Sequence, residues 1–412
     1  MKIYTPPPDK SITIRALLLG AVARGRTVVR NPLRSHDTQA ALRCLKELGV
    51  RTKILKDRVE ITGAGPGGFG PGPFRLDAGE SGTLARLLAG LLAGAGARAV
   101  ITGRGTLRRR PMEPVAAALR LAGAGVRASR GRLPLTIRPS GPKCGALKYS
   151  APGAQIKSSL LLAGLGAAAP LSFAEAAPSR DHTERLLKLM CARLRVSGRR
   201  LTVYPGSLEG RTVKVPGDIS SAAPFIAAAL LSGRAIKIKG VGLNPGRLGF
   251  IRTLAKMGAK ITVSRKSSSP EPVGDIMISP SALRAARVAA RDIPSMIDEV
   301  PLLALLAARA RGTTVMNGAG ELRNKESDRI RSTLALLASL GAKASYRNGT
   351  LRVPGGQGFR PLKPVETFGD HRVFMAGAAA SAACPGLKIK NPGCTDKSYP
   401  GFARDFRRVF RS

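Results

Sequence analysis

Two adjacent carboxylates, Asp298 and Glu299, lie in the otherwise apolar stretch 293–301. Carboxylates are uncommon among apolar residues unless they have partners. One interpretation is that they cap the helix that follows. The other is that one of them is a general base, whose pKa is set by burial and by nearby cations.

Charges of both signs meet again downstream, in the segment Asn324-Lys325-Glu326-Ser327-Asp328-Arg329. On a helix, Lys325 and Arg329 would share one face, with Glu326 at the helix start. Alone, the segment is consistent with a surface ion-pair ladder, which contributes little to stability. Together with the other cations described below, it is a candidate part of a binding site.

A third group of candidates lies near the start of the chain, where Lys10, Ser11 and Arg15 follow Pro8 and Asp9. Ser11 is predicted to cap a helix, with Lys10 just before it and Arg15 one turn on. The free N–H groups and the dipole of a helix N-terminus favour anions, and two cations strengthen that preference. The alternative is an ordinary helix cap with incidental surface cations.

Three further cations are candidates for a binding site. Arg110, in Arg108–Pro111, and Arg372, after Asp370, stand at expected helix starts, and Lys397 is the third. Each is weak evidence alone. Because they fall at matching points of a repeated pattern, we predict one composite site that binds phosphate and carboxylate groups bidentately through arginine.

The elements that must position these side chains form six similar units. Helices rich in small apolar residues are expected to begin near Ser11, Ser81, Gln155, Ser220, Asp298 and Asp370, at intervals of 65 to 78 residues. Each unit is expected to contain a second helix, which is amphipathic. These helices are expected over 37–48, 111–122, 181–194, 246–257, 326–340 and 401–410. The segments ELGV, LAGAGV, KMGAKI and SLGAKA each place a glycine where a left-handed helix cap is needed, just before a strand.

One such unit cannot bury both faces of its sheet, so three units around a common core make an economical domain. A chain of 412 residues is long enough for two domains. The sequence therefore predicts an α/β protein with two domains of three units each.

The net charge is extreme: 68 Lys and Arg stand against 25 Asp and Glu, which gives +43. The basic residues are spread over all six units and the chain has no Trp, whereas nucleic-acid binders concentrate charge and add aromatic residues for stacking. A solvated basic surface is the favoured interpretation, and specific nucleic-acid binding is not expected.

The five cysteines and three histidines are widely spaced and lack a C-x-x-C pair, so no metal site is predicted and a reducing compartment is favoured. Residues 1–10 lack the apolar run of a signal peptide. The longest nearly uncharged stretch, 158–174, is interrupted by Gly164, Gly166 and Pro170, and it is not expected to span a membrane. We predict a cytoplasmic protein.

The candidate residues and helix starts lie in ten short motifs. In chain order these motifs are DKSITIRALLLGAVARG, ESGTLARLLAG, RRRPM, AQIKSSLLLAGL, PSRDHTERLLKLM, GDISSAAPFIAAALL, IPSMIDEVP, LRNKESDRI, GDHR and CTDKSYPGF. This ordered set, from Lys10 to Phe402, resembles the 5-enolpyruvylshikimate-3-phosphate synthase family. The resemblance implies an enolpyruvyl transferase fold, a two-domain inside-out α/β barrel built from six βαβαββ repeats. The domains would be 10–216, and 1–9 with 217–412, with two crossovers.

The resemblance implies a 3-phosphoshikimate 1-carboxyvinyltransferase. Such an enzyme transfers the enolpyruvyl group of phosphoenolpyruvate to the 5-hydroxyl of shikimate 3-phosphate, in chorismate and aromatic amino acid biosynthesis. The reaction is an addition followed by elimination of phosphate, and it needs no metal or other cofactor. A monomer is expected, in which domain closure excludes water and aligns the reactants.

The resemblance also implies the site residues. Phosphoenolpyruvate is expected to bind Lys10, Gly82, Thr83, Arg110, Gln155, Arg329, Arg372 and Lys397. Shikimate 3-phosphate is expected to bind Lys10, Ser11, Arg15, Gln155, Ser179, Arg180, Asp298 and Lys325. Asp298 would take the hydroxyl proton, and Glu326, with Lys10, would protonate and deprotonate the methylene carbon, because the addition needs a base and an acid together.

The chain departs from the family pattern at three motifs. Asp9 replaces the usual Ser of PGSKS, Glu80 replaces the usual Asn of NSGT, and Gly153-Ala154 replaces the Ser-Ala or Ser-Ser before Gln155. The last change removes one or both hydroxyls expected to bind the sugar phosphate, at a cost of about 1–3 kcal/mol unless a backbone N–H substitutes.

Two rival functions remain. An enolpyruvyl transferase acting on UDP-N-acetylglucosamine would share the fold, but it carries a reactive Cys in the loop where this chain has Thr106–Pro111. A catalytically impaired, basic, nucleic-acid-binding repeat protein would account for the charge and for Gly153.

Overall fold

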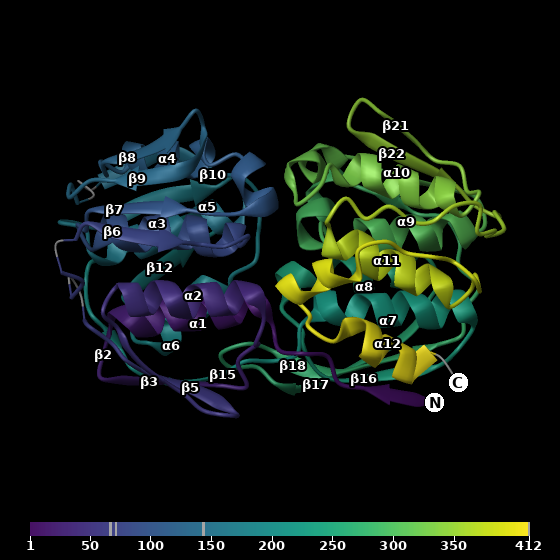
Figure 1. Ribbon diagram of the computed structural model, residues 1–412, viewed down its shortest axis with the longest axis horizontal. Coiled ribbons are helices and arrows are strands. Elements are labelled where there is room, and N and C mark those ends of the chain that lie inside the picture. The colour runs from purple at the N-terminus through teal and green to yellow at the C-terminus, as the bar shows by residue number, and fades with distance from the viewer. Residues whose placement is uncertain (66–67, 71, 142–144, 411–412) are drawn as a thin grey trace. The chain divides into compact units, whose positions relative to one another are not determined.

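The computed structural model describes residues 1–65, 68–70, 72–141 and 145–410. It divides into two compact units, one of Pro8–Val215 and one of Met1–Pro7 with Pro216–Ser412. Each unit is described below by itself. Figure 1 shows the course of the chain through both.

The unit Pro8–Val215 has three four-stranded sheets with one common order, in which the first pair of strands is parallel and the next two pairs are antiparallel. Across the sheets the strands are β15 (Thr212–Lys214), β3 (Arg26–Arg30), β5 (Arg58–Thr62) and β4 (Arg51–Ile54); β6 (Phe74–Asp77), β7 (Ala99–Thr102), β9 (Arg132–Ile137) and β8 (Val126–Ser129); and β10 (Gly145–Ala151), β11 (Leu171–Glu175), β13 (Arg200–Val203) and β12 (Leu194–Ser197). A short parallel pair joins β2 (Ala23–Arg24) to β14 (Leu208–Glu209).

The other unit repeats this order in two sheets. Their strands are β1 (Lys2–Tyr4), β16 (Ile236–Gly242), β18 (Val273–Ser279) and β17 (Lys260–Ser267); and β19 (Arg287–Val288), β20 (Thr313–Met316), β22 (Thr350–Pro354) and β21 (Ser345–Arg347). In the last repeat, a single parallel bridge between Val365 and Ile389 stands where a first strand pair would be.

The helices alternate between buried and partly exposed ones along the chain. They are α1 (Lys10–Val22), α2 (His36–Glu47), α3 (Gly82–Gly94), α4 (Glu113–Leu121), α5 (Ala154–Leu165), α6 (His182–Leu189), α7 (Ile219–Ser232), α8 (Gly249–Lys256), α9 (Val300–Arg309), α10 (Arg329–Ser339), α11 (His371–Ser381) and α12 (Phe402–Phe410). Short 3-10 helices are η1 (Gly105–Arg109), η2 (Pro245–Arg247), η3 (Ala290–Ser295), η4 (Ala319–Asn324) and η5 (Pro392–Lys397).

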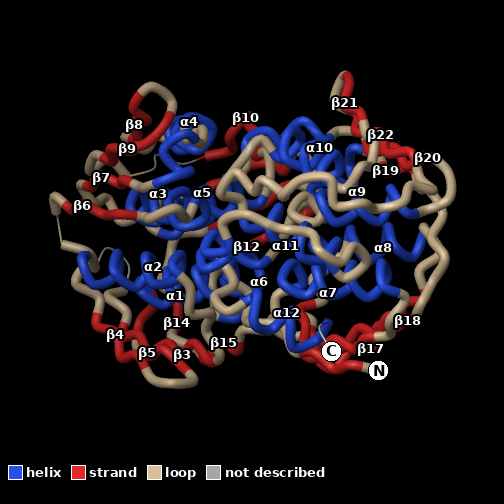
Figure 2. The backbone as a smooth tube through the Cα atoms, turned by 45° about the vertical axis from the view of Figure 1, so that its right-hand side comes forward, coloured by secondary structure: helices blue, strands red, loops and turns tan. Residues whose placement is uncertain are grey.

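The first helix of each repeat is buried on nearly every side, as its small apolar residues predict. In α3, all 13 residues are buried, and α3 packs against α5 in the core of its unit. Figure 2 shows β3, β4 and β5 along one edge of their unit, next to α1 and α2. In the part of the chain that the structure describes, no helix is long and apolar enough to cross a membrane.

The second helices are amphipathic, and four of them end at a left-handed glycine. Gly49, Gly123, Gly258 and Gly341 follow α2, α4, α8 and α10 with φ between 72° and 89°. This region strains any residue with a Cβ, so the predicted caps are confirmed.

Three predicted helix ranges need correction. The helix predicted over 181–194 ends at Leu189, and Leu194 begins β12. The helix predicted over 246–257 is two elements, because the backbone of Leu248 leaves helical geometry between η2 and α8. The helix predicted over 326–340 begins only at Arg329, since the carboxylate of Asp328 accepts hydrogen bonds from two of the first backbone N–H groups.

Candidate active site

The N-terminus of α1 holds the first group of predicted site residues, but its cap differs from the prediction. Asp9, not Ser11, is the N-cap, because its backbone is extended and its carboxylate accepts the N–H of Ile12 at 2.9 Å. Lys10 is therefore the first residue of the helix. Its Nζ lies 2.9 Å from Oδ2 of Asp37, which is 5% exposed at the start of α2. A carboxylate thus neutralises part of the charge that an anion would meet at Lys10.

Arg15 lies one turn further along α1 and is buried by the third repeat of its unit. Its Nε donates to Oγ1 of Thr183 at 2.8 Å, and its Nη2 donates to Oγ of Ser158 at 3.2 Å. These two hydroxyls lie 2.7 Å apart. Nη1 of Arg15 also donates to the carbonyl of Ser11, which joins two predicted ligands of shikimate 3-phosphate within the same unit.

The start of α3 brings a second group together around Gln155 of α5. The amide nitrogen of Gln155 donates to Oγ1 of Thr83 at 3.0 Å, and its amide oxygen accepts from Nη1 of Arg86 at 2.7 Å. Since a guanidinium can only donate, Arg86 determines which end of the amide faces Thr83. Gln155 is therefore held in one orientation.

Gly82 allows two guanidinium groups to approach the first turn of α3. A Cβ at this position would lie 2.5 Å from Nη1 of Arg110 and 2.8 Å from Nη1 of Arg86. Arg110 is buried, whereas its neighbours Arg108 and Arg109 are exposed. Of the three consecutive arginines, only Arg110 faces this group.

Ser179 and Arg180 lie in the loop between β11 and α6, and Ser179 is tied to a buried cluster. Its hydroxyl donates to Oε1 of Glu175 at 2.6 Å. Glu175 contacts Nζ of Lys157, which is 1% exposed and also lies 2.6 Å from Oε1 of Glu184. Burial raises the pKa of Glu184 above its ordinary value, although Lys157 opposes the shift.

The unusual Gly153 directly precedes α5 and Gln155. Its φ is 86°, a left-handed value that a serine would adopt only with strain. The glycine at this departure from the family pattern therefore matches the local backbone.

In the other unit, Arg329 gathers three carboxylates. Its Nη1 lies 2.9 Å from Oδ1 of Asp298, its Nη2 lies 2.5 Å from Oε2 of Glu326, and its Nε lies 2.8 Å from Oδ2 of Asp370. Burial alone would lower the pKa of Arg329, but Asp370, Glu326 and Asp298 together raise it well above its ordinary value. The guanidinium therefore remains charged.

The predicted helical spacing of Lys325 and Arg329 is wrong. Lys325 has an extended backbone at the end of η4, and the helix begins four residues later. Asp298 and Glu299 precede α9, and the side chain of Glu299, the N-cap residue, makes no capping hydrogen bond. Asp298 contacts Arg329 of the same repeat, and Glu299 contacts Ser220 of the preceding one.

The two remaining cations lie near the start of α11. Asp370 caps this helix through the N–H of Arg372 at 2.9 Å, and Nη1 of Arg372 donates to the carbonyl of Ser220 at 2.8 Å. Nζ of Lys397, at the end of η5, lies 3.3 Å from the carbonyl oxygen of Gly369. Asp298, Glu326, Arg329 and Arg372 thus form one connected group.

Four residues that contact the candidate site residues are not predicted as part of the site from the sequence: Arg86, Thr183, Asp370 and Ser220. A signal for Arg86 was available, because it stands four residues after Gly82 as Arg15 stands four residues after Ser11. The others depend on contacts between distant repeats. Among the described residues, no group of three or more His, Cys, Asp and Glu could hold a metal ion.

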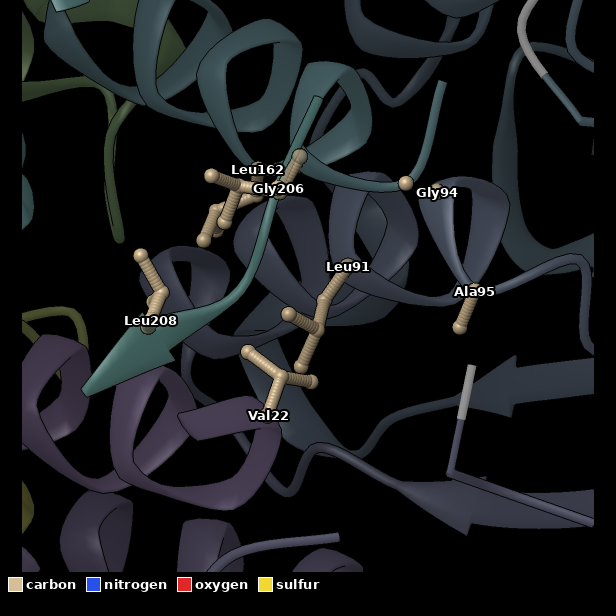
Figure 3. A pocket seen from close by; sticks show the side chains of 9 residues that line it. Val22, Leu91, Gly94, Ala95, Leu162, Gly206 and Leu208 are labelled. Carbon is tan, nitrogen blue, oxygen red and sulfur yellow. The ribbon is translucent and has the colours of Figure 1, made fainter. Parts of the chain in front are cut away.

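The pocket in Figure 3 lies among α1, α3 and α5, and the described residues that line it include no charged one. It has a volume of about 20 Å³ and is lined by Val22, Leu91, Gly94, Ala95, Leu162, Leu165, Gly166, Gly206 and Leu208. An apolar hole of this size does not suit a multiply anionic substrate.

Residues 2–406 match the family model described as EPSP synthase (3-phosphoshikimate 1-carboxyvinyltransferase). The chain is 42% identical to the 3-phosphoshikimate 1-carboxyvinyltransferase of Desulforudis audaxviator, over 96% of this chain and 94% of that protein. It is 41% identical to the Geobacillus kaustophilus protein of the same name, over 98% and 96%. The solved EPSP synthase of Acinetobacter baumannii superposes with a TM-score of 0.84 at 35% identity, over 99% of this chain and 95% of that one. The chain belongs to the EPSP synthase family.

Proposed function

We propose that this chain transfers the enolpyruvyl group of phosphoenolpyruvate to the 5-hydroxyl of shikimate 3-phosphate and releases phosphate, in chorismate and aromatic amino acid biosynthesis. The family match over residues 2–406 carries this proposal. The connected group of Asp298, Glu326 and Arg329 supports it, because the reaction needs a base and an acid together.

Asp298 is the base that takes the proton of the 5-hydroxyl, and Glu326 is the acid that gives a proton to the methylene carbon of phosphoenolpyruvate. In the second step, Glu326 takes a proton back from the resulting methyl group, and the leaving phosphate takes the proton held by Asp298, so both carboxylates return to their starting states. Both carboxylates contact the buried guanidinium of Arg329. When one gains a proton and the other loses one, the net charge around Arg329 stays constant, which avoids charging a buried site.

The remaining assignments concern binding. Phosphoenolpyruvate is held by Lys10, Gly82, Thr83, Arg110, Gln155, Arg329, Arg372 and Lys397, and shikimate 3-phosphate by Lys10, Ser11, Arg15, Gln155, Ser179, Arg180, Asp298 and Lys325. Cations and hydroxyls of this kind bind phosphate and carboxylate groups through charge-assisted hydrogen bonds. The fixed orientation of Gln155 and the buried position of Arg110 support the assignment.

We also propose the family's inside-out α/β barrel of six βαβαββ repeats, with domains of 10–216, and of 1–9 with 217–412. Five four-stranded sheets of one order, and the two compact units, support this proposal. A cytoplasmic monomer is part of it. The free thiols of Cys44, Cys191, Cys384 and Cys394 support a reducing compartment, whereas Cys144 lies outside the described residues.

The charge distribution bears on the nucleic-acid alternative. Residues 8–215 hold 36 Lys and Arg against 12 Asp and Glu, and the remainder holds 32 against 13. The excess is therefore shared by both parts of the chain, whereas a dedicated nucleic-acid surface concentrates it.

The proposal is tested by measuring phosphate release from phosphoenolpyruvate with shikimate 3-phosphate as acceptor, and separately with UDP-N-acetylglucosamine. We expect release only with shikimate 3-phosphate. Release only with the UDP sugar would identify the rival transferase. No release with either acceptor, together with nucleic-acid binding that survives moderate salt, would support the nucleic-acid alternative.

A further inference from the structure

The fourth repeat, which begins with α7, supplies none of the predicted site residues, yet one of its side chains lies at the centre of a buried network. Ser220 is 1% exposed in the first turn of α7. Its hydroxyl donates to Oε1 of Glu299 and accepts from Nη2 of Arg247 at 2.6 Å. Its backbone carbonyl accepts from Nη1 of Arg372 at 2.8 Å.

The chemistry of the three groups fixes the direction of these hydrogen bonds. A guanidinium has donors only and an ionised carboxylate has acceptors only, so a hydroxyl between Arg247 and Glu299 must accept from the first and donate to the second. Arg247 and Glu299 are 3% and 2% exposed, so each depends on such partners for its charge. Ser220 is thus held from two sides.

Asp218, the N-cap of α7, also holds the backbone of this first turn. Oδ1 of Asp218 accepts from the N–H of Ser220 and from Nη2 of Arg247, both at 2.9 Å. Hydrogen bonds therefore hold both the side chain and the backbone N–H of Ser220, and these bonds set the position of the carbonyl oxygen that accepts from Arg372. A shift of Ser220 would shift the acceptor that orients this guanidinium.

Together with further contacts, these interactions form a closed ring that passes through the N-terminal ends of four helices. Glu299 is bonded along the chain to Asp298, which pairs with Arg329. Arg329 pairs with Asp370, which accepts the N–H of Arg372, and Arg372 returns to Ser220. The helices concerned, α7, α9, α10 and α11, pack together within one unit (Figure 1).

We propose that Ser220, held by Glu299 and Arg247, is a positioning residue for Arg372, and that the fourth repeat contributes to phosphoenolpyruvate binding in this way. The inference rests on the proposed function, in which Arg372 binds phosphoenolpyruvate. It predicts a specific kinetic signature, because a displaced Arg372 weakens the binding of phosphoenolpyruvate and not that of shikimate 3-phosphate.

The test compares Ser220→Ala, Glu299→Gln and the double variant with the wild type, measuring the KM of each substrate by phosphate release. Ser220→Ala removes the hydroxyl and leaves the carbonyl in place. Because Arg372 would lose part of its alignment, each single change is expected to raise the KM for phosphoenolpyruvate about tenfold, which corresponds to about 1.4 kcal/mol of binding free energy. The KM for shikimate 3-phosphate should stay within twofold of the wild-type value.

Ser220→Ala removes the hydrogen bond from Ser220 to Glu299, and Glu299→Gln weakens the same bond by removing the charge of its acceptor, so the double variant should resemble the more impaired single variant. Ser221→Ala is the matched control: Ser221 is equally buried in the same turn, but its hydroxyl contacts Asp218 at 3.3 Å. Its kinetics should equal those of the wild type. Thermal unfolding checks that each variant is folded, and Glu299→Gln decides the question alone if Ser220→Ala fails to fold.

The inference is overturned if folded Ser220→Ala keeps the wild-type KM for phosphoenolpyruvate. It is equally overturned if both KM values rise together, or if the two single effects multiply in the double variant. Failure of the proposed function looks different, since the wild type itself would then release no phosphate.

Discussion

Nη1 of Arg329 lies 2.9 Å from Oδ1 of Asp298, and the arginine side chain is 1% exposed. The residue proposed as the base is therefore held by a buried cation, while its own side chain is 19% exposed. The same guanidinium holds Glu326 and Asp370. The proposed catalytic carboxylates are thus partly exposed members of one cluster around a buried cation, and changes to its members should have distinguishable effects.

Replacing Asp298 with Asn keeps the size of the side chain and removes its basicity. We expect kcat to fall about 10²- to 10⁴-fold, the usual contribution of a positioned general base, with a much smaller change in either KM. Steady-state phosphate release measures this. Asp292→Asn, in the preceding 3-10 helix, is the charge-matched control. Normal turnover by Asp298→Asn would show that the base is misassigned.

Glu326→Gln should also depress kcat, because an amide cannot donate a proton to the methylene carbon. The combined Asp298→Asn, Glu326→Gln variant should lose less than the product of the two single effects, since the carboxylates act in the same step. Single-turnover measurements with both substrates test this. Multiplicative losses would mean that the two residues act in separate steps.

Arg329→Met tests the cluster as a structural unit. It leaves three carboxylates without their shared cation, so the free energy of unfolding should fall by about 3–5 kcal/mol, as when a buried ion pair loses one partner. Arg347→Met, at an exposed position of β21, should change it by less than about 0.5 kcal/mol. Urea denaturation monitored by circular dichroism compares them. Equal stability of the two variants would contradict the account.

Arg110→Ala should act mainly on substrate binding. Arg110 is 8% exposed and faces Gly82, whereas the adjacent Arg109 is exposed. We expect Arg110→Ala to raise the KM for phosphoenolpyruvate at least tenfold, and Arg109→Ala to leave it near the wild-type value. Similar effects of the two substitutions would indicate that the general positive charge matters rather than the buried position.

Glu184 makes the stability of the protein depend on pH in a specific direction. Burial raises its pKa in the folded state, so the folded protein holds this proton more tightly than the unfolded chain does. Its contribution is therefore favourable at low pH and is lost as pH rises through the raised pKa. Glu184→Gln should gain stability relative to the wild type as pH rises from the ordinary pKa of glutamate, about 4.3, through the raised pKa of Glu184.

Urea denaturation of both proteins across this range measures the difference. A constant difference would mean that the pKa of Glu184 is not raised. Lys157→Met provides the opposite case, because it removes the cation that Glu184 and Glu175 share. This variant should be strongly destabilised at neutral pH and less so in acid.

The repeat pattern could be predicted from the sequence because it depends on local signals. Small apolar residues mark the buried helices, and glycines such as Gly49 and Gly341 mark the ends of the amphipathic ones. The first residue of a helix is harder to predict where two neighbouring polar residues could each serve as the N-cap. Asp9 and Ser11 are both good caps, and only the backbone conformation decides for Asp9.

The candidate site residues followed from family motifs, but their partners could not be predicted locally. Arg329 meets Asp370 across 41 residues, and Ser220 meets Arg372 across 152. Such contacts depend on how the repeats pack, which no local periodicity records. The sequence alone therefore identifies Ser220 only as part of a helix start.

The most direct test of the central claim is to run the reaction in D2O and examine the product by mass spectrometry and NMR. If addition precedes elimination, the methylene carbon becomes a methyl group by accepting a proton from Glu326, which exchanges with solvent. The account predicts deuterium in the vinyl group of the product, together with one phosphate released per transfer. A product vinyl group without deuterium, or phosphate release without transfer, would contradict it.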